Sequence, residues 1–201
     1  MKRIFFLIVL SLIYSAPARA AELYKFDKEH TTILFFVNHL GFSQMVGIFT
    51  DYDGSFMFNE TRPEESSVQV VISPAGIQTS SKALNKELQG SNWFNAKQFP
   101  EMKFISTSIK LTGEKTADIT GDFTLLGVTK PVTLKVRFNK TGYHPLTNDY
   151  IAGFYAEGVI KRSDFGMDYL TSMGVGDDVY LQIQAEGINQ DRKRPAIVHQ
   201  H

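Results

Sequence analysis

Few residues in this sequence could carry out acid–base, nucleophilic or metal chemistry. The histidines are His30, His39, His144, His199 and His201, and there is no cysteine. Without cysteine the chain has no disulfides, no thiolate nucleophile and no thiolate metal ligand. The sequence also lacks an H-E-x-x-H metal motif, a G-x-S-x-G nucleophile motif and a phosphate-binding glycine loop. These absences argue against the common classes of hydrolase and against a nucleotide-binding protein.

His39 is the histidine with the most suggestive position. Residues 31–40 read as a strand in which Ile33, Phe35 and Val37 share one face. His39 continues this apolar row. A histidine at the end of an inward row commonly bonds a backbone carbonyl. The alternative is a polar contact at the mouth of a pocket, where the imidazole would hold the head of an otherwise apolar ligand.

Arg162 is the second polar candidate. It lies in residues 161–166, KRSDFG, where an expected strand ends in a glycine-containing turn. Its guanidinium is expected to pair with Asp164 or to donate to loop carbonyls. If the ligand carried a phosphate, Arg162 would be the natural partner, because a guanidinium matches oxyanion geometry.

Both candidates depend on segments that read as antiparallel strands. The clearest is residues 117–138, ADITGDFTLLGVTKPVTLKVRF, in which apolar and polar side chains alternate on both arms of a central turn. Successive side chains of a strand point to opposite faces, so each arm is apolar on one side only. Further strand-like runs are residues 46–58, 68–73, 101–111, 150–161 and 179–186. Many such strands separated by turns predict a sandwich or a barrel.

Two segments depart from simple alternation. In residues 46–58 the period of two slips, which predicts a bulge or bend near Asp51. Residues 80–95, SSKALNKELQGSNWFN, are rich in helix formers, begin with serines that can cap a helix, and contain Gly90 as a stop. The sequence therefore predicts a short helical segment around residues 81–95. Trp93, just after it, is expected to plug one end of the fold or to line a ligand path.

The chain begins with features of secretion. Residues 1–20 combine a basic start, a short apolar run and an Ala-Arg-Ala cleavage signal, so they are interpreted as a signal peptide. We expect a domain over residues 21–188 and a polar, disordered tail over residues 189–201, in which His199 and His201 are more simply solvated than metal-bound. The full chain has 21 basic and 21 acidic residues, and residues 1–20 contain three of the basic ones (Lys2, Arg3 and Arg19) and no acidic one, which leaves 18 basic against 21 acidic residues, a net charge of −3. The mature chain therefore has no basic excess to bind nucleic acid.

An ordered series of motifs resembles the YceI family. Its members are periplasmic, lipocalin-like antiparallel barrels that carry polyisoprenoid or related long-chain lipids. The resemblance covers residues 22–187. The matching motifs are Asp27-x-x-His30-Thr31, Phe35-x-Val37-x-His39, Gly47-x-Phe49, Tyr52-x-Gly54, the block from Gly121 to Val132, Arg162-Ser163-Asp164-Phe165-Gly166 and Val175-Gly176-Asp177-Asp178-Val179. The resemblance implies an all-β fold, an eight-stranded barrel whose apolar face looks inward.

The resemblance also implies a function. The expected role is a periplasmic, non-enzymatic carrier of a long-chain apolar lipid such as a polyisoprenoid, an isoprenoid quinone or a fatty amide. No covalent cofactor, no metal and no stable membrane insertion are expected, and the chain is expected to be a monomer or a homodimer. The predicted ligand-binding residues are Ile33, Phe35, Val37, His39, Phe49, Phe123, Leu125, Val132, Leu134, Val136, Phe138 and Arg162.

Two departures from the family pattern bear on the ligand. Leu84-Asn85-Lys86-Glu87-Leu88 stands where the family has Arg-Asp-x-His-Leu, and Val46 replaces an arginine. If those polar positions hold a charged head group, this chain would prefer a neutral ligand. Two alternatives remain open at this stage. One is a small outer-membrane barrel with its apolar face turned outward, and the other is a lipid-modifying enzyme that uses His39 or Asp164 as acid–base.

Overall fold

The structure is a computed structural model of the chain, and it describes residues 20–193. Most of these residues lie in antiparallel strands. The strands are β1 (Glu22–Phe26), β2 (Thr32–His39), β3 (Ser43–Phe49), β4 (Tyr52–Phe58), β5 (Ser67–Ile72), β6 (Ile77–Gln78), β7 (Met102–Gly113), β8 (Thr116–Leu125), β9 (Val128–Tyr143), β10 (Asp149–Lys161) and β11 (Val175–Lys193). The helices are α1 (Lys82–Leu88) and the short 3-10 helices η1 (Pro63–Glu65), η2 (Pro74–Gly76), η3 (Arg162–Phe165) and η4 (Thr171–Met173).

The strands close into a barrel. Their hydrogen bonding runs in the order β1-β4-β5-β7-β8-β9-β10-β11, and β11 then pairs with β1. Along its first half β11 pairs instead with β2, which continues to β3 and β6. In the barrel wall, β1 and β2 therefore occupy one strand position as two consecutive segments. The same holds for β3 with β4 and for β5 with β6. Counted in this way, the described residues form the predicted eight-stranded closed antiparallel barrel.

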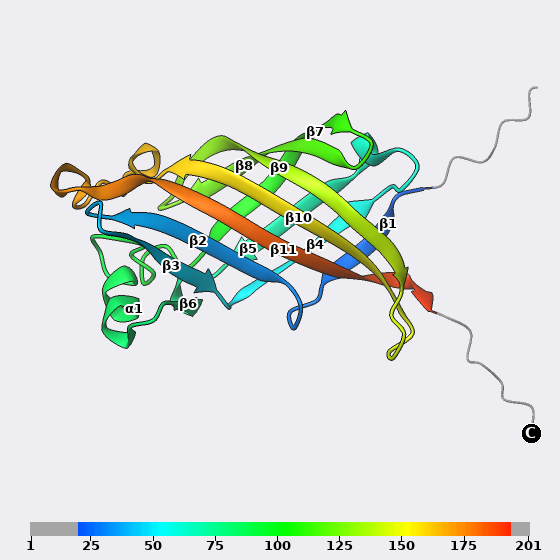
Figure 1. Ribbon diagram of the computed structural model, residues 1–201, viewed down its shortest axis with the longest axis horizontal. Coiled ribbons are helices and arrows are strands. Elements are labelled where there is room, and N and C mark those ends of the chain that lie inside the picture. Colours follow the sequence, from blue (N-terminus) through cyan, green and yellow to red (C-terminus); the bar gives the residue numbers. More distant parts are fainter. Residues whose placement is uncertain (1–19, 194–201) are drawn as a thin grey trace, which may run out of the picture.

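The barrel has two distinct ends (Figure 1). The helix end carries α1, the turn between β2 and β3, and the loop of residues 162–174. The terminus end carries the start of β1, the end of β11 and the hairpins β7–β8 and β9–β10.

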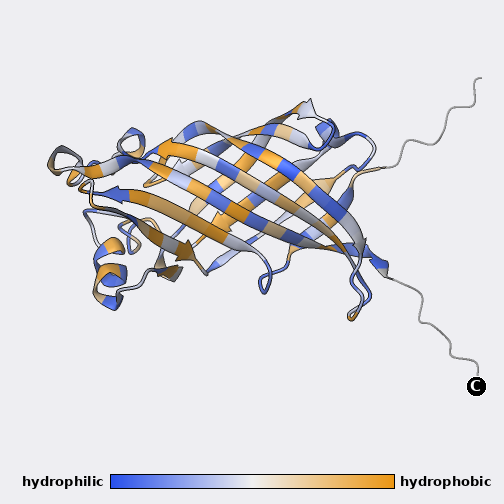
Figure 2. Cartoon of the chain, viewed as in Figure 1, coloured by the Kyte–Doolittle hydropathy of each residue, from blue (hydrophilic) through white to orange (hydrophobic). Residues whose placement is uncertain are grey.

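Side-chain alternation determines which face of each strand is inside. On β9, Val132, Leu134 and Val136 are partly buried, whereas Thr133 and Lys135 between them are exposed. Figure 2 shows the same interchange of apolar and polar residues along the wall strands. The apolar face of residues 117–138 therefore looks into the barrel, because a period of two places alternate residues on the same side.

The irregularity predicted near Asp51 is present, and it divides the run 46–58 into two strands: β3 ends at Phe49 and pairs with β2, while β4 begins at Tyr52 and pairs with β1 and β5. One boundary differs from the prediction. The domain does not end at residue 188, because β11 continues to Lys193. The polar residues there find strand partners in β1 and β10. The predicted disordered tail is thus wrong for residues 189–193.

The predicted helical segment is present and is shorter than expected. Ser81 caps α1, its hydroxyl accepting a hydrogen bond from the Leu84 amide at 3.3 Å. The helix ends at Leu88, and residues 89–98 continue as turns. Within residues 20–193, none of the helices has the length and apolar character needed to cross a membrane. The predicted signal peptide lies outside the described residues except for Ala20, and so do His199 and His201.

Candidate functional site

The interior of the barrel contains a cavity of about 430 Å³. Its lining includes side chains from β1 to β5 and β7 to β11 and from the segment around Leu88, Trp93 and Phe94. Most of these side chains are apolar. Pockets for small organic ligands commonly measure about 300–1,000 Å³. The barrel thus holds both a packed core and a continuous apolar space.

The predicted ligand-facing residues lie in this lining, with one exception. Lining positions are held by Ile33, Phe35, Val37, Phe49, Phe123, Leu125, Val132, Leu134, Val136, Phe138 and Arg162. Ile33, Phe35 and Val37 are buried, as alternation on β2 requires. Their role in binding a ligand remains a prediction, because a side chain that packs in the barrel core can also border the cavity.

His39 is the exception. It lies on the last residue of β2 and is exposed. On β2 only Asn38 separates Val37 from His39, whereas on β11 their partners Val179 and Val175 are four residues apart. β2 itself stays regular, because its pairing with β3 runs without interruption to His39, which faces Ser43. His39 therefore lies at the rim, exposed and outside the cavity lining, and the prediction that it lines the cavity was wrong.

Many lining residues were not predicted. They come chiefly from β4, β5, β7, β10 and β11, and include Phe56, Phe58, Val68, Val70, Met102, Phe104, Ile109, Phe154, Ala156, Ile160, Val179, Leu181, Ile183 and Ala185. The signal was available on β11, where Val179, Leu181, Ile183 and Ala185 keep a period of two. Which positions on the other strands face inward depends on the closure of the barrel.

A glycine on β3 makes room for one of the lining rings. Gly47 lies directly beneath the Phe35 side chain, and a Cβ added there would lie only 2.1 Å from the Phe35 Cζ atom. Any larger residue would push the Phe35 ring away from the wall and into the cavity. The family block Gly47-x-Phe49 thus has a packing reason in this chain.

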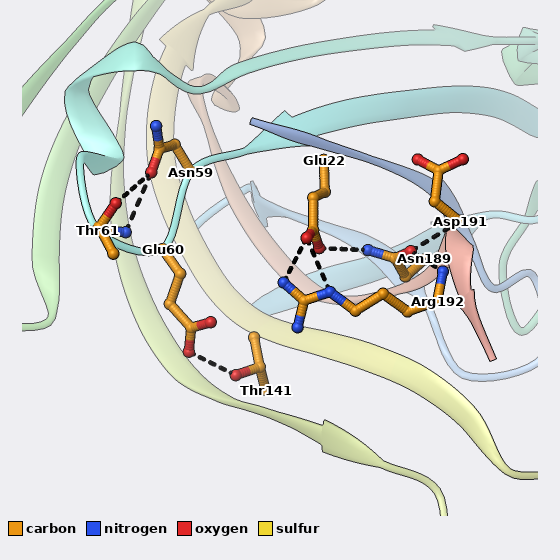
Figure 3. A network of polar contacts seen from close by, with 8 residues as sticks. All are labelled: Glu22, Asn59, Glu60, Thr61, Thr141, Asn189, Asp191 and Arg192. Carbon is orange, nitrogen blue, oxygen red and sulfur yellow. Dashed lines mark hydrogen bonds and ion pairs between the residues drawn. The ribbon is translucent and has the colours of Figure 1, made fainter. Parts of the chain in front are cut away.

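Charged and hydroxyl side chains surround the cavity at the terminus end. Exposed Glu60, Glu114 and Lys115 contribute to the lining between the β4–β5 connection and the β7–β8 hairpin. Figure 3 shows Glu60 held by the Thr141 hydroxyl, which donates to Glu60 Oε1 at 2.7 Å. Because these residues are both exposed and part of the lining, they form a polar mouth for an otherwise apolar space.

Arg162 is buried at the helix end and its donors are used within the protein. Nε donates to the Gly176 carbonyl at 2.8 Å, Nη1 to those of Met167 and Tyr169 at 2.8 and 2.9 Å, and Nη2 to that of Val175 at 3.1 Å. The guanidinium also lies 5.2 Å from the centre of the Trp93 ring. Burial lowers the pKa of Arg162, which still stays charged at neutral pH. The expectation that it satisfies loop carbonyls is confirmed.

Asp164 does not pair with Arg162, although the sequence allowed it. Its carboxylate lies 3.4 Å from the Lys130 ammonium on the surface. Trp93 is buried beside Arg162, and its ring meets Tyr169 edge-on at 5.4 Å. Trp93 therefore both closes the helix end and lines the cavity, so the two expectations for it hold together.

The terminus end is packed by aromatic rings and a polar network. Tyr24 stacks on Phe56 with centroids 5.1 Å apart, and Phe58 meets Phe154 edge-on at the same distance. Beside them Glu22 accepts hydrogen bonds from Asn189 and Arg192 (Figure 3). Burial is the main cause that raises the pKa of Tyr24 to about 12. This network joins the first and last described strands.

Comparison with known proteins agrees with this architecture. Residues 24–187 match the family of YceI-like domains. Protein YceI of Escherichia coli O157:H7 is 40% identical over 183 residues, which cover 90% of this chain and 94% of that protein. The crystal structure of Burkholderia cenocepacia BcnA superposes with a TM-score of 0.73 at 22% identity, covering 80% of this chain and 98% of BcnA.

A further solved structure is more distant in sequence. It is a polyisoprenoid binding domain from Saccharophagus degradans, with a TM-score of 0.58 at 13% identity, covering 85% of this chain and 99% of that domain. At this identity and that of BcnA, the likeness concerns the fold alone. The family match and the relative from E. coli extend over nearly the whole barrel, so the chain belongs to the YceI-like family.

Proposed function

We propose that this protein is a periplasmic, non-enzymatic binder or carrier of a long-chain apolar lipid held inside the barrel. The observation that carries the proposal is the apolar cavity, which continues from the buried helix end to a polar mouth. Burial of a hydrocarbon chain contributes roughly 0.8 kcal/mol per CH₂ group. A long lipid therefore needs no reactive group to be held. The name of the Saccharophagus domain, a polyisoprenoid binding domain, supports the same ligand class.

The charges of the cavity favour a neutral head group. Among its lining residues Arg162 already donates to four carbonyls, and Lys115 shares the mouth with the acidic Glu114 and Glu60. An anionic head would meet more negative than free positive charge at this mouth. A polyisoprenol, an isoprenoid quinone or a fatty amide would fit better than an isoprenyl phosphate.

Two competing functions receive less support. A barrel that spans a bilayer turns apolar side chains outward, whereas Thr133, Lys135 and Arg137 lie on the exposed face of β9. A lipid-modifying enzyme would need an acid–base group facing the cavity. The two sequence candidates, His39 and Asp164, lie outside the lining described for residues 20–193.

The proposal is tested by extracting lipid from the purified protein and identifying it by mass spectrometry. We expect a stoichiometric long-chain lipid in the native protein. Val136→Trp, which adds a large ring inside the cavity, should reduce the bound lipid severalfold. Lys135→Trp, one residue away on the exposed face, is the matched control and should retain the lipid. A native protein that is empty and takes up neither decaprenol nor ubiquinone would overturn the proposal.

The head-group preference has its own test. The delipidated protein is offered equal amounts of an isoprenyl phosphate and a quinone with the same chain length. We expect the quinone to be retained preferentially. Preference for the phosphate would contradict the neutral-ligand proposal while leaving the lipid-binding function intact.

A further inference from the structure

A cluster of metal-ligating groups lies on the barrel wall away from the cavity. Asp27 and His30 belong to the turn between β1 and β2, and Glu186 belongs to β11. One ligand atom from each residue lies within 4.8 Å of the other two. His30 Nδ1 is 2.7 Å from Asp27 Oδ2. The three side chains are absent from the cavity lining, so the lipid function does not use them.

The backbone around this cluster is held by several hydrogen bonds. The Asp27 amide donates to the Glu186 carbonyl at 2.9 Å, and the Thr31 amide donates to the Asp27 carbonyl at 2.9 Å. The Thr31 hydroxyl donates to the Glu186 carbonyl and accepts from the Glu186 amide, each at 3.0 Å. Buried Tyr52 donates from its hydroxyl to the Thr31 carbonyl at 2.9 Å. The turn and the strand are therefore fixed relative to each other before any ligand binds.

The side chains themselves leave coordination capacity free. The Glu186 carboxylate makes no hydrogen bond or ion pair in the described part of the chain. Asp27 accepts from the Glu29 amide through Oδ1 and contacts His30 through Oδ2, and its side chain is only 13% exposed. Two carboxylates with a neutral imidazole carry two negative charges. This pair of charges, with no lysine or arginine bonded to it, attracts a divalent cation.

We propose that Asp27, His30 and Glu186 bind a divalent transition-metal ion of the zinc class. Imidazole nitrogen with carboxylate oxygen suits such ions better than magnesium or calcium, which prefer oxygen alone. Three protein ligands leave at least one position for water. The His30 Nδ1 and the Asp27 oxygen that now face each other would both turn to the metal. A neutral imidazole would then carry its proton on Nε2, and a protonated one would release the Nδ1 proton to solvent.

The place of this site in the fold gives it a structural consequence. β11 pairs with β2 up to Gln184 and with β1 from Gly187 onward. Glu186 lies in the interval between these two pairings, at the seam where the barrel closes. A metal bridging Glu186 to the β1–β2 turn would tie the seam together. Because the cluster forms only in the folded chain, metal binding would stabilise the folded state by mass action.

The experiment is a titration of the purified protein with Zn²⁺, and with Co²⁺ as a spectroscopic probe. His199 and His201 are replaced by alanine throughout, so that the terminal histidines do not contribute. We expect saturable binding of one metal per chain, and thermal unfolding at a higher temperature with zinc than with a chelator. His30→Ala and Glu186→Gln should each weaken binding by about tenfold or more. His39→Gln, an exposed histidine on the same barrel, is the matched control and should bind as the parent does.

His30→Ala and Glu186→Gln are preferred to a change at Asp27, because the Asp27 carboxylate also accepts from the turn amide. Circular dichroism without metal checks that each variant is folded. Zinc binding that is absent from the parent, or equally strong in both folded variants, would overturn the proposal. The lipid content measured above should not depend on zinc, so the two proposals fail independently.

Discussion

Each end of the barrel holds an arginine that is largely removed from water. The guanidinium groups of the two arginines have different kinds of partner. At the helix end Arg162 is 2% exposed, and its guanidinium donates to four backbone carbonyls, two in the loop of residues 162–174 and two at the start of β11. At the terminus end Arg192 pairs with Glu22 and lies 4.4 Å from the centre of the Tyr150 ring, with its side chain 19% exposed.

The difference shows what each arginine stabilises. A guanidinium presents several donors at fixed angles, so Arg162 can bond carbonyls of the loop and of the start of β11 at once and hold residues 162–176 in shape. Glu22 and Arg192 are far apart in sequence, so their ion pair joins the two ends of the described chain. Bonds to carbonyls are buried and directional, whereas a partly exposed ion pair is weakened by water and by salt.

Replacing Arg162 should have the largest effect. In Arg162→Met one buried and three partly buried carbonyls lose their donor. Each unsatisfied buried acceptor costs about 1–3 kcal/mol. With partial access of water, we expect a loss of about 3–5 kcal/mol in the free energy of unfolding measured with urea. Arg162→Lys keeps the charge but not the planar set of N–H donors of the guanidinium. It should therefore recover only a minor part of the lost free energy of unfolding. Full recovery by lysine would mean that charge, not geometry, is what the loop needs.

The second effect concerns Tyr24, which lies in the network of the terminus end. Its pKa in the folded protein is raised from 10.0 to about 12. The contribution that the Tyr24 hydroxyl makes to the free energy of unfolding through this shift is fully present below pH 10 and is lost as the pH rises toward 12. The expected loss is about 2 kcal/mol over that range. The free energy of unfolding is measured from pH 9 to 12. The native protein should show this loss, and so should the control Tyr180→Phe, because Tyr180 is exposed. In Tyr24→Phe the free energy of unfolding should fall less over the same range.

Replacing Arg192 should have a smaller effect than either of these. Arg192→Met removes the ion pair with Glu22 and the contact with Tyr150, at a cost of about 1 kcal/mol. The measurement is urea unfolding beside Arg162→Met under identical conditions. If the Arg192 variant lost as much stability as the Arg162 variant, the contrast between the two ends would be wrong.

Salt should produce the smallest effect. Raising ionic strength from about 0.05 to 1 M screens partly exposed charges. The difference in stability between the native protein and Arg192→Met should shrink by a few tenths of a kcal/mol. The difference for Arg162→Met should change less, because the hydrogen-bond partners of Arg162 are neutral carbonyls and the residue is buried. An equal salt dependence for both variants would indicate that both sites are reached by ions.

The two arginines also differ in how far sequence could predict them. Arg162 stands in a recognisable motif at the end of a strand, and its use of loop carbonyls was expected. Arg192 lies in a run of polar residues that reads as a solvated tail. Local composition predicts disorder there because it takes no account of partners from distant strands. β1 and β10 supply those partners, and β11 therefore extends to Lys193.

Local periodicity by itself determined the strands, their apolar faces and most of the predicted cavity lining, because alternation depends only on neighbouring residues. The tertiary structure decided what depends on pairing between distant segments. The wall ends at His39, so this residue lies exposed at the rim and outside the cavity lining although it continues the apolar row in sequence. Closure of the barrel brought Glu186 to Asp27 and His30 across more than 150 residues. No short-range pattern encodes these contacts, since they arise from strand register and from the closing of the wall.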